Sequence, residues 1–183
     1  MEPLEFNADF FTLFQLPRAF RLDLAELERR YREAQQAVHP DRFAAAGNEA
    51  RRVSLQWAAR VNEAWQTLKS PLARARYLLE LAGQAIGTTS NPAMDSAFLM
   101  EQMEWREAAQ EARVRRDPRA LEHLRDRLAQ TLEASFREVA VALDERGEYA
   151  VAAECVRRLM FQEKLARELD DALAALEDEE ADA

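Results

Sequence analysis

Apolar residues recur at steps of three and four along most of this chain, which is the spacing of one buried face of an α-helix. The period is clear in two neighbouring segments, from Leu24 to Val38 and from Val53 to Leu68, and again in the second half of the sequence. No stretch alternates convincingly with the period of two that a half-buried strand would show. With only four glycines and six prolines among 183 residues, the pattern predicts an all-α fold.

Capping and helix-breaking residues mark where the predicted helices begin and end. Asp23 followed by Glu26 forms a capping box at the start of one helix. Ser70-Pro71 and Asp117-Pro118 each place an N-cap residue before a proline at the first helical position. The helices predicted in this way cover approximately residues 9–16, 23–38, 49–69, 71–83, 93–116, 118–146 and 148–177.

Turn-forming residues between Ala85 and Pro92 indicate a linker between two helical parts. The first part contains a helical hairpin, and the second contains three long helices with short connections, which favour an antiparallel three-helix bundle. The predicted division is an N-terminal domain over 1–83, a linker over 84–92, a bundle over 93–177 and a frayed acidic tail over 178–183.

The formal net charge of −9 is concentrated in the second half of the chain. Residues 1–83 contain 12 Lys and Arg against 11 Asp and Glu, whereas residues 84–183 contain 13 against 23. A long acidic half repels phosphate backbones, so nucleic acid is not an expected partner.

Composition gives no indication of a metal, a cofactor or a membrane. The one cysteine, Cys155, lies in an apolar helical context and excludes an internal disulfide and multi-cysteine metal motifs. The two histidines, His39 and His123, are far apart in the sequence. We find neither a signal sequence nor a long uncharged apolar run, and therefore expect a soluble, cytoplasmic protein without a cofactor.

The stretch His39-Pro40-Asp41 lies between the two amphipathic segments described first. Proline disfavours helical geometry at the residue before it and cannot continue a helix, so the first segment must end here. The tripeptide therefore occupies the tip of a helical hairpin, with its imidazole and carboxylate directed outward. On these residues alone, Pro40 could simply terminate the helix and Asp41 could cap the next one.

The context of this tripeptide resembles the J-domain of DnaJ-type co-chaperones. Tyr31 precedes it and Arg42-Phe43 follow it. The next helix carries the family's later core pattern, N-x-A-x-x-x-L, at Asn62, Ala64 and Leu68. The resemblance implies that the N-terminal part is a J-domain and that the tripeptide contacts an ATPase chaperone of the DnaK class.

Helical geometry places a basic face on the first helix of the hairpin, opposite its apolar face. Arg29 and Arg32 share this face, and Arg30 lies on its flank. The face could be an ordinary solvated surface, because Glu28 and Glu33 are interspersed with the arginines. In J-domains the corresponding surface meets an acidic patch on the chaperone, which implies that binding involves Arg29, Arg30, Arg32 and, after the tripeptide, Arg42.

The segment from Phe98 to Glu111 has apolar residues on two helical faces. Phe98 and Trp105 lie on one side, and a second apolar stripe with a rim of carboxylates lies on the other. A helix of a small bundle needs one apolar stripe, so the second suggests a docking surface. It could equally contribute to an interdomain interface or a wider bundle core, and Phe161 could join either the surface or the core.

The run from Phe98 to Glu104, together with residues 64–68 and 71–79, is similar to HscB, the J-type co-chaperone family of iron–sulfur cluster biogenesis. The resemblance covers nearly the whole chain and, without a cysteine-rich N-terminal extension, is typical of the bacterial form. In that family the C-terminal bundle binds the cluster scaffold protein IscU through an apolar and acidic patch. Carried onto this sequence, the patch consists of Leu99, Met100, Met103, Glu104, Glu107, Glu111 and Phe161.

The resemblance implies a two-ended adaptor without chemistry of its own. It would bind an IscU-like scaffold, deliver it to an HscA-like chaperone of the DnaK class and stimulate that chaperone's ATPase. An enzyme that uses His39 and Asp41 as a catalytic pair is disfavoured, because no nucleophile, glycine-rich phosphate loop or metal set accompanies them. A J-domain adaptor for a different client, or a bundle whose J-domain is silent, remains the alternative.

Overall fold

The computed structural model describes residues 8–39, 47–84, 86 and 95–181, and every regular element in these ranges is a helix. The all-α fold expected from the sequence is therefore confirmed. The elements are α1 (Phe10–Leu13), α2 (Leu24–Ala37), α3 (Asn48–Lys69), α4 (Pro71–Leu81), α5 (Ser96–Val114), α6 (Pro118–Ala140), the π-helical turn η2 (Val141–Arg146) and α7 (Tyr149–Ala181).

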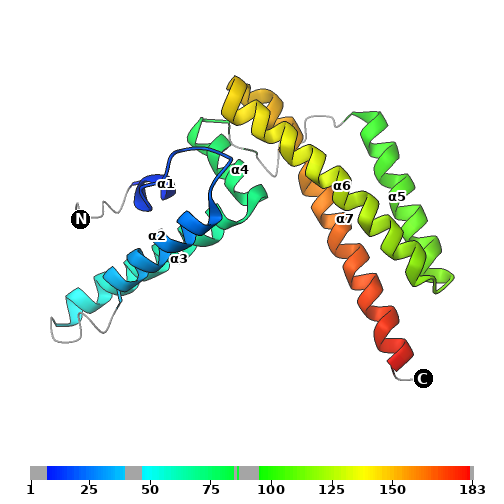
Figure 1. Ribbon diagram of the computed structural model, residues 1–183, viewed down its shortest axis with the longest axis horizontal. Coiled ribbons are helices and arrows are strands. Elements are labelled where there is room, and N and C mark those ends of the chain that lie inside the picture. The colour runs from blue at the N-terminus through cyan, green and yellow to red at the C-terminus, as the bar shows by residue number, and fades with distance from the viewer. Residues whose placement is uncertain (1–7, 40–46, 85, 87–94, 182–183) are drawn as a thin grey trace.

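The helices form a hairpin and a bundle, as the pattern predicts (Figure 1). Helices α2 and α3 lie side by side, with α1 packed against α3. Helices α5 and α7 each pack against α6, which runs antiparallel to both. Helix α4 contacts both α3 and α7 and so joins the hairpin to the bundle. The linker predicted over 84–92 lies almost entirely outside the described residues.

An aromatic cluster packs the short helix α1 against the hairpin. The side chains of α1 lie between α2, α3 and α4. Phe11 and Phe14 are completely buried, and Tyr77 of α4 stacks on Phe10 with ring centroids 4.5 Å apart. The Tyr77 hydroxyl also accepts a hydrogen bond of 3.0 Å from the Phe10 amide. Burial of these large aromatic side chains stabilises the packing of α1 and α4 against the hairpin.

The helix ends follow the sequence signals with few differences. The Asp23 side chain accepts hydrogen bonds from the amides of Ala25 and Glu26, and Ser70 and Asp117 cap the two proline-initiated helices. The last helix continues to Ala181 instead of ending near Glu177. Val53, expected on a buried face, is exposed. The sixth predicted helix is α-helical only to Ala140, because its last six residues form the π-helical turn.

Within the described residues, no helix is long and apolar enough to span a membrane, and no group of three potential ligand side chains is arranged to hold a metal ion.

Candidate functional site

A hydrogen bond joins the C-terminal end of α2 to α3, at the point where the hairpin tip begins. The buried hydroxyl of Ser54 donates a hydrogen bond of 2.6 Å to the carbonyl of Val38, the C-cap residue of α2. Such carbonyls have no partner within their own helix. His39 follows directly and is exposed. Pro40, Asp41 and Arg42 lie outside the described residues, so their contacts with a partner stay a prediction.

Tyr31 joins α2 to α3 below this tip. Its ring stacks on Trp65 with a centroid distance of 4.6 Å, and its hydroxyl donates a hydrogen bond of 2.9 Å to the Asn62 side chain. Asn62, one of the residues that carry the J-domain resemblance, therefore has a structural role in fixing the two helices. Ala64 and Leu68 of the same pattern are completely buried.

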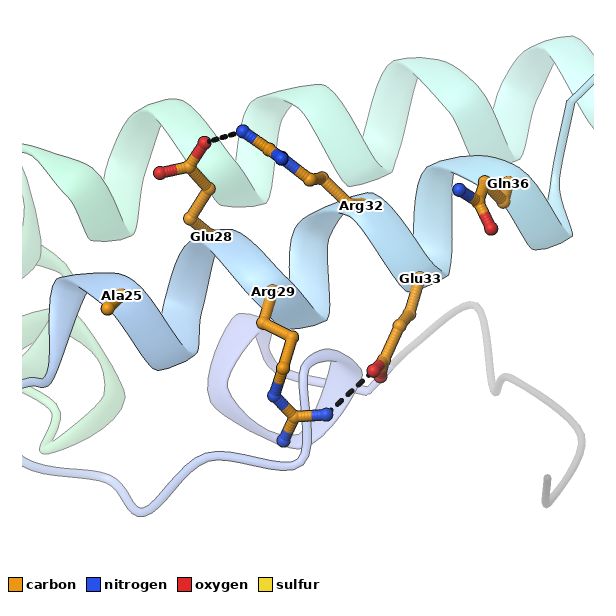
Figure 2. Close-up of a pocket in the computed structure, with 6 residues that line it drawn as sticks. All are labelled: Ala25, Glu28, Arg29, Arg32, Glu33 and Gln36. Atoms are coloured by element: carbon orange, nitrogen blue, oxygen red, sulfur yellow. Dashed lines mark hydrogen bonds and ion pairs between the residues drawn. The ribbon is translucent and has the colours of Figure 1, made fainter.

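The outer face of α2 carries the arginines that the sequence placed there. Arg29, Arg32 and Gln36 border a shallow depression along the exposed side of the helix, together with two glutamates (Figure 2). Arg29 forms ion pairs of 2.6 Å with Glu26 and 2.7 Å with Glu33, and Arg32 pairs with Glu28. The face is therefore a row of alternating, mutually paired charges.

These ion pairs determine the charge state of Glu26 and the exposure of the arginines on this face. Hydrogen bonds from Arg29 and then Arg30 lower the pKa of Glu26, so that carboxylate stays ionised beside the arginines. Arg30 is half-buried and is also held by Gln15, with Nη1 3.0 Å from Oε1. Arg29 and Arg32 are consequently more exposed than Arg30 on this helix face, and each is paired with at least one carboxylate of its own helix.

The second candidate surface lies on α5, on the side away from the bundle core. Phe98, Trp105 and Ala112 are buried, as the helical period predicts. The opposite side leaves Leu99 43% exposed, Met100 63% exposed and Met103 60% exposed. The interpretation of this stripe as part of an interdomain or bundle core is therefore wrong, and the stripe is an open apolar surface.

Phe161 and three glutamates complete this surface. Phe161 of α7 is 38% exposed, and its ring meets Phe98 edge-on at 6.1 Å, so it lies at the seam between α7 and α5. Glu104, Glu107 and Glu111 are exposed on α5, and Glu111 pairs with Arg115 at 2.6 Å. The apolar surface with its acidic rim, termed the α5 patch below, consists of Leu99, Met100, Met103, Glu104, Glu107, Glu111 and Phe161.

The loop between α1 and α2 is hydrogen-bonded to the end of the bundle that lies nearest the hairpin. The amides of Phe20 and Arg21 donate hydrogen bonds of 2.7 and 2.8 Å to the two oxygens of Asp144. Phe20 is buried against Phe136 of α6, and the guanidinium of Arg74 lies over its ring. Asp144 belongs to the π-helical turn, which gives this carboxylate its position at the loop. The hairpin and the bundle are thus joined by shared packing and by a specific anchor.

Sequence reasoning missed this anchor, because a helical period of 3.6 does not reveal a π-helical turn and Asp144 resembles any exposed acidic residue. Replacing Asp144 with alanine is expected to lower the free energy of unfolding by about 1–2 kcal/mol, since two amides lose a charged acceptor. Urea unfolding measures this change. The matched control is Asp126→Ala on α6, whose side chain is 71% exposed. Equal midpoints for both variants would contradict the assignment.

Comparison with known proteins places this geometry in context. Residues 94–170 match the family model described as the HSCB C-terminal oligomerisation domain. The chain is 53% identical to the co-chaperone protein HscB homolog of Aromatoleum aromaticum, over 95% of this chain and 98% of that protein. It is 51% identical to the homolog of Bordetella pertussis, over 90% and 95%.

Two solved structures of HscB proteins have a fold similar to that of this chain. Chaperone HscB from Vibrio cholerae aligns with a TM-score of 0.83 at 36% identity, over 92% of this chain and 99% of that one. Human co-chaperone protein HscB aligns with a TM-score of 0.85 at 29% identity, over 91% and 82%. The similarity extends over both the hairpin and the bundle.

Proposed function

The chain belongs to the HscB family of J-domain co-chaperones, which act in iron–sulfur cluster biogenesis, and we propose that it binds an IscU-like scaffold protein through the α5 patch and presents it to an HscA-like chaperone of the DnaK class. In this proposal the chain performs no chemistry itself. It works in the cytoplasm as an adaptor whose two ends recognise two different proteins.

The observation that carries this proposal is the exposure of Leu99, Met100 and Met103 on a helix whose other face already packs in the core. Contiguous exposed apolar side chains with a polar rim are typical of protein-binding surfaces, and methionine adapts to an irregular partner. Glu104 and Glu107 form no ion pair among the described residues, so they are available to cationic side chains of the scaffold. The charges of Glu104 and Glu107 mainly affect the orientation of the bound scaffold and the rate at which it associates.

At the other end, the hairpin tip and the outer face of α2 would meet the chaperone. Asp41 would pair with an arginine of the chaperone, Pro40 would hold the shape of the loop and His39 would add imidazole contacts. Acceleration of ATP turnover requires the tip to bind the hydrolysis-competent conformation of the chaperone more tightly than its resting conformation. The chaperone then closes on the scaffold that the α5 patch has delivered.

The anchor between Asp144 and the loop of Phe20 supports a joint action of the two ends. Because the hairpin and the bundle share packing, a scaffold held on α5 stays at a defined distance from the chaperone that the tip has engaged. Binding of the scaffold by the chaperone then becomes an intramolecular step with a high effective concentration.

The test of this function is the ATPase rate of the purified chaperone with the adaptor, with the scaffold and with both. The proposal predicts that the two together stimulate ATP turnover more than the sum of their separate effects. Purely additive rates, or no binding between this chain and the scaffold by calorimetry, would contradict it.

The paired charges on α2 lead to a separate prediction. Replacing Glu28 and Glu33 with glutamine removes the carboxylate paired with Arg32 and one of the two carboxylates paired with Arg29, while the ion pair between Arg29 and Glu26 stays. Fewer intrahelical carboxylates then compete with an acidic chaperone surface for these arginines. We expect association with the chaperone to become roughly two- to tenfold faster at low salt. The difference should vanish near 1 M salt, where the Debye length is about 3 Å.

Stopped-flow association rates over a salt series measure this effect. The control variant removes the same number of charges from α6, at Glu122 and Glu133, far from the α2 face. If the control accelerates association as much as the α2 variant, only net charge matters and the pairing on α2 is irrelevant.

A further inference from the structure

A glutamine lies in the buried stripe by which α5 packs onto the bundle. Gln102 is only 4% exposed and sits one helical turn from both Phe98 and Arg106. These two neighbours contact α7: Phe98 meets the ring of Phe161, and Arg106 lies 3.8 Å from Glu168. Gln102 therefore lies between them, at the seam where α5 meets α7.

A second glutamine occupies the buried face of α7 at nearly the same level. Gln162 is 5% exposed and lies between the buried residues Leu159 and Leu165. The contacts Phe98–Phe161 and Arg106–Glu168 show that α5 and α7 run in parallel with a nearly constant offset. By that offset Gln162 lies less than one helical turn from Gln102 along the bundle.

The side-chain amide oxygens of Gln102 and Gln162 are both buried without a hydrogen-bond donor in the part of the chain that the structure describes. Burial of an unpaired carbonyl destabilises a fold, and a side chain of similar length without the amide, such as methionine, would fill the same space without this cost. The two glutamines lie near the boundary between two apolar clusters: Leu159 belongs to the cluster near η2 and Leu165 to the cluster around Trp105, and Leu132 packs against both.

The two glutamines lie beside the α5 patch, inside the seam between α5 and α7. Gln102 is next to Met103 and one turn from Leu99 on the same helix, and Gln162 is next to Phe161. A partner that binds across these exposed residues thus covers the seam that conceals both amides. A small separation of α5 from α7 at this level would expose two acceptors to that partner.

We propose that Gln102 and Gln162 are the concealed polar floor of the α5 patch: α5 separates from α7 when the scaffold protein binds, and the two amide oxygens then accept hydrogen bonds from donor groups of the scaffold. This inference rests on the proposed function, because it assigns further specificity-determining residues to the same surface. The partner segment that fits has N–H donors, backbone or side chain, among apolar groups.

The test uses Gln102→Met and Gln162→Met, singly and together, with Gln130→Met on the exposed side of α6 as the matched control. Methionine keeps the side-chain length and removes the amide. The double variant should bind the scaffold about tenfold more weakly by calorimetry. Its melting temperature should equal or exceed that of the wild type, and amides of α5 should exchange hydrogen more slowly.

Two results would overturn the inference. One is wild-type affinity in the double variant, and the other is weaker binding accompanied by a lower melting temperature, which would indicate a purely structural role. Failure of the proposed function itself looks different, because the wild type would then not bind the scaffold at all. The control variant should match the wild type in affinity.

Discussion

Replacing Asp41 with asparagine is expected to return the chaperone's ATP turnover to its unstimulated rate while the scaffold protein is still captured normally. Asparagine preserves the size of the side chain but loses the charge, and charge-assisted hydrogen bonds to a cationic partner are roughly twice as strong as neutral ones. Without this pair, the tip no longer favours the hydrolysis-competent conformation. Steady-state ATPase assays should give a rate within about twofold of the chaperone alone.

The matched control for this variant is Asp126→Asn, which neutralises an exposed aspartate on α6. The control should stimulate ATP turnover as the wild type does. If Asp41→Asn retains full stimulation, the hairpin tip is not the element that acts on the chaperone, and the resemblance to J-domains would lose its functional meaning here.

Removing the exposed apolar side chains of α5 should have the opposite consequence. In the triple variant Leu99→Ala, Met100→Ala and Met103→Ala, we expect scaffold affinity to fall roughly a hundredfold or more, at about 1 kcal/mol for each truncated side chain. Stability should change little, because these side chains are exposed. Calorimetric titration with the scaffold measures the loss, and stimulation of the chaperone without scaffold should be unchanged.

The control for the triple variant truncates an exposed apolar residue outside the α5 patch. Val151 of α7 is 50% exposed and lies near the start of that helix, so Val151→Ala should bind the scaffold like the wild type. Scaffold binding by the triple variant at wild-type affinity would show that the partner docks elsewhere.

Much of the fold was predictable from the sequence, because its signals are local. Asp23, Ser70-Pro71 and Asp117-Pro118 mark helix starts by capping chemistry, which depends on the few residues that follow. The period of 3.6 also revealed the second apolar stripe of α5, but it left open whether that stripe was a docking surface or part of a core, and the residues of the α5 patch came from the resemblance to HscB. The open question of whether the second stripe was buried required the structure.

Other features depend on contacts between distant parts of the chain. The hydrogen bonds of Asp144 join it to the loop of Phe20, more than 120 positions earlier, and no local pattern encodes that pairing. Gln102 looked like one polar residue among many on α5, although it faces the core. The pairing of Arg29 and Arg32 could have been anticipated from the spacing of Glu28 and Glu33, which lie four residues from their partners.

The central claim is that one chain must carry both ends, and mixing two half-defective variants tests it most directly. The Asp41→Asn variant is expected to bind the scaffold but not to stimulate the chaperone. The triple α5 variant is expected to stimulate the chaperone but not to bind the scaffold. An equimolar mixture is assayed for scaffold-dependent stimulation of the chaperone's ATPase. The account predicts that the mixture fails to restore the synergy seen with the wild type. Full synergy from the mixture would show that the two ends act independently and would contradict the adaptor mechanism.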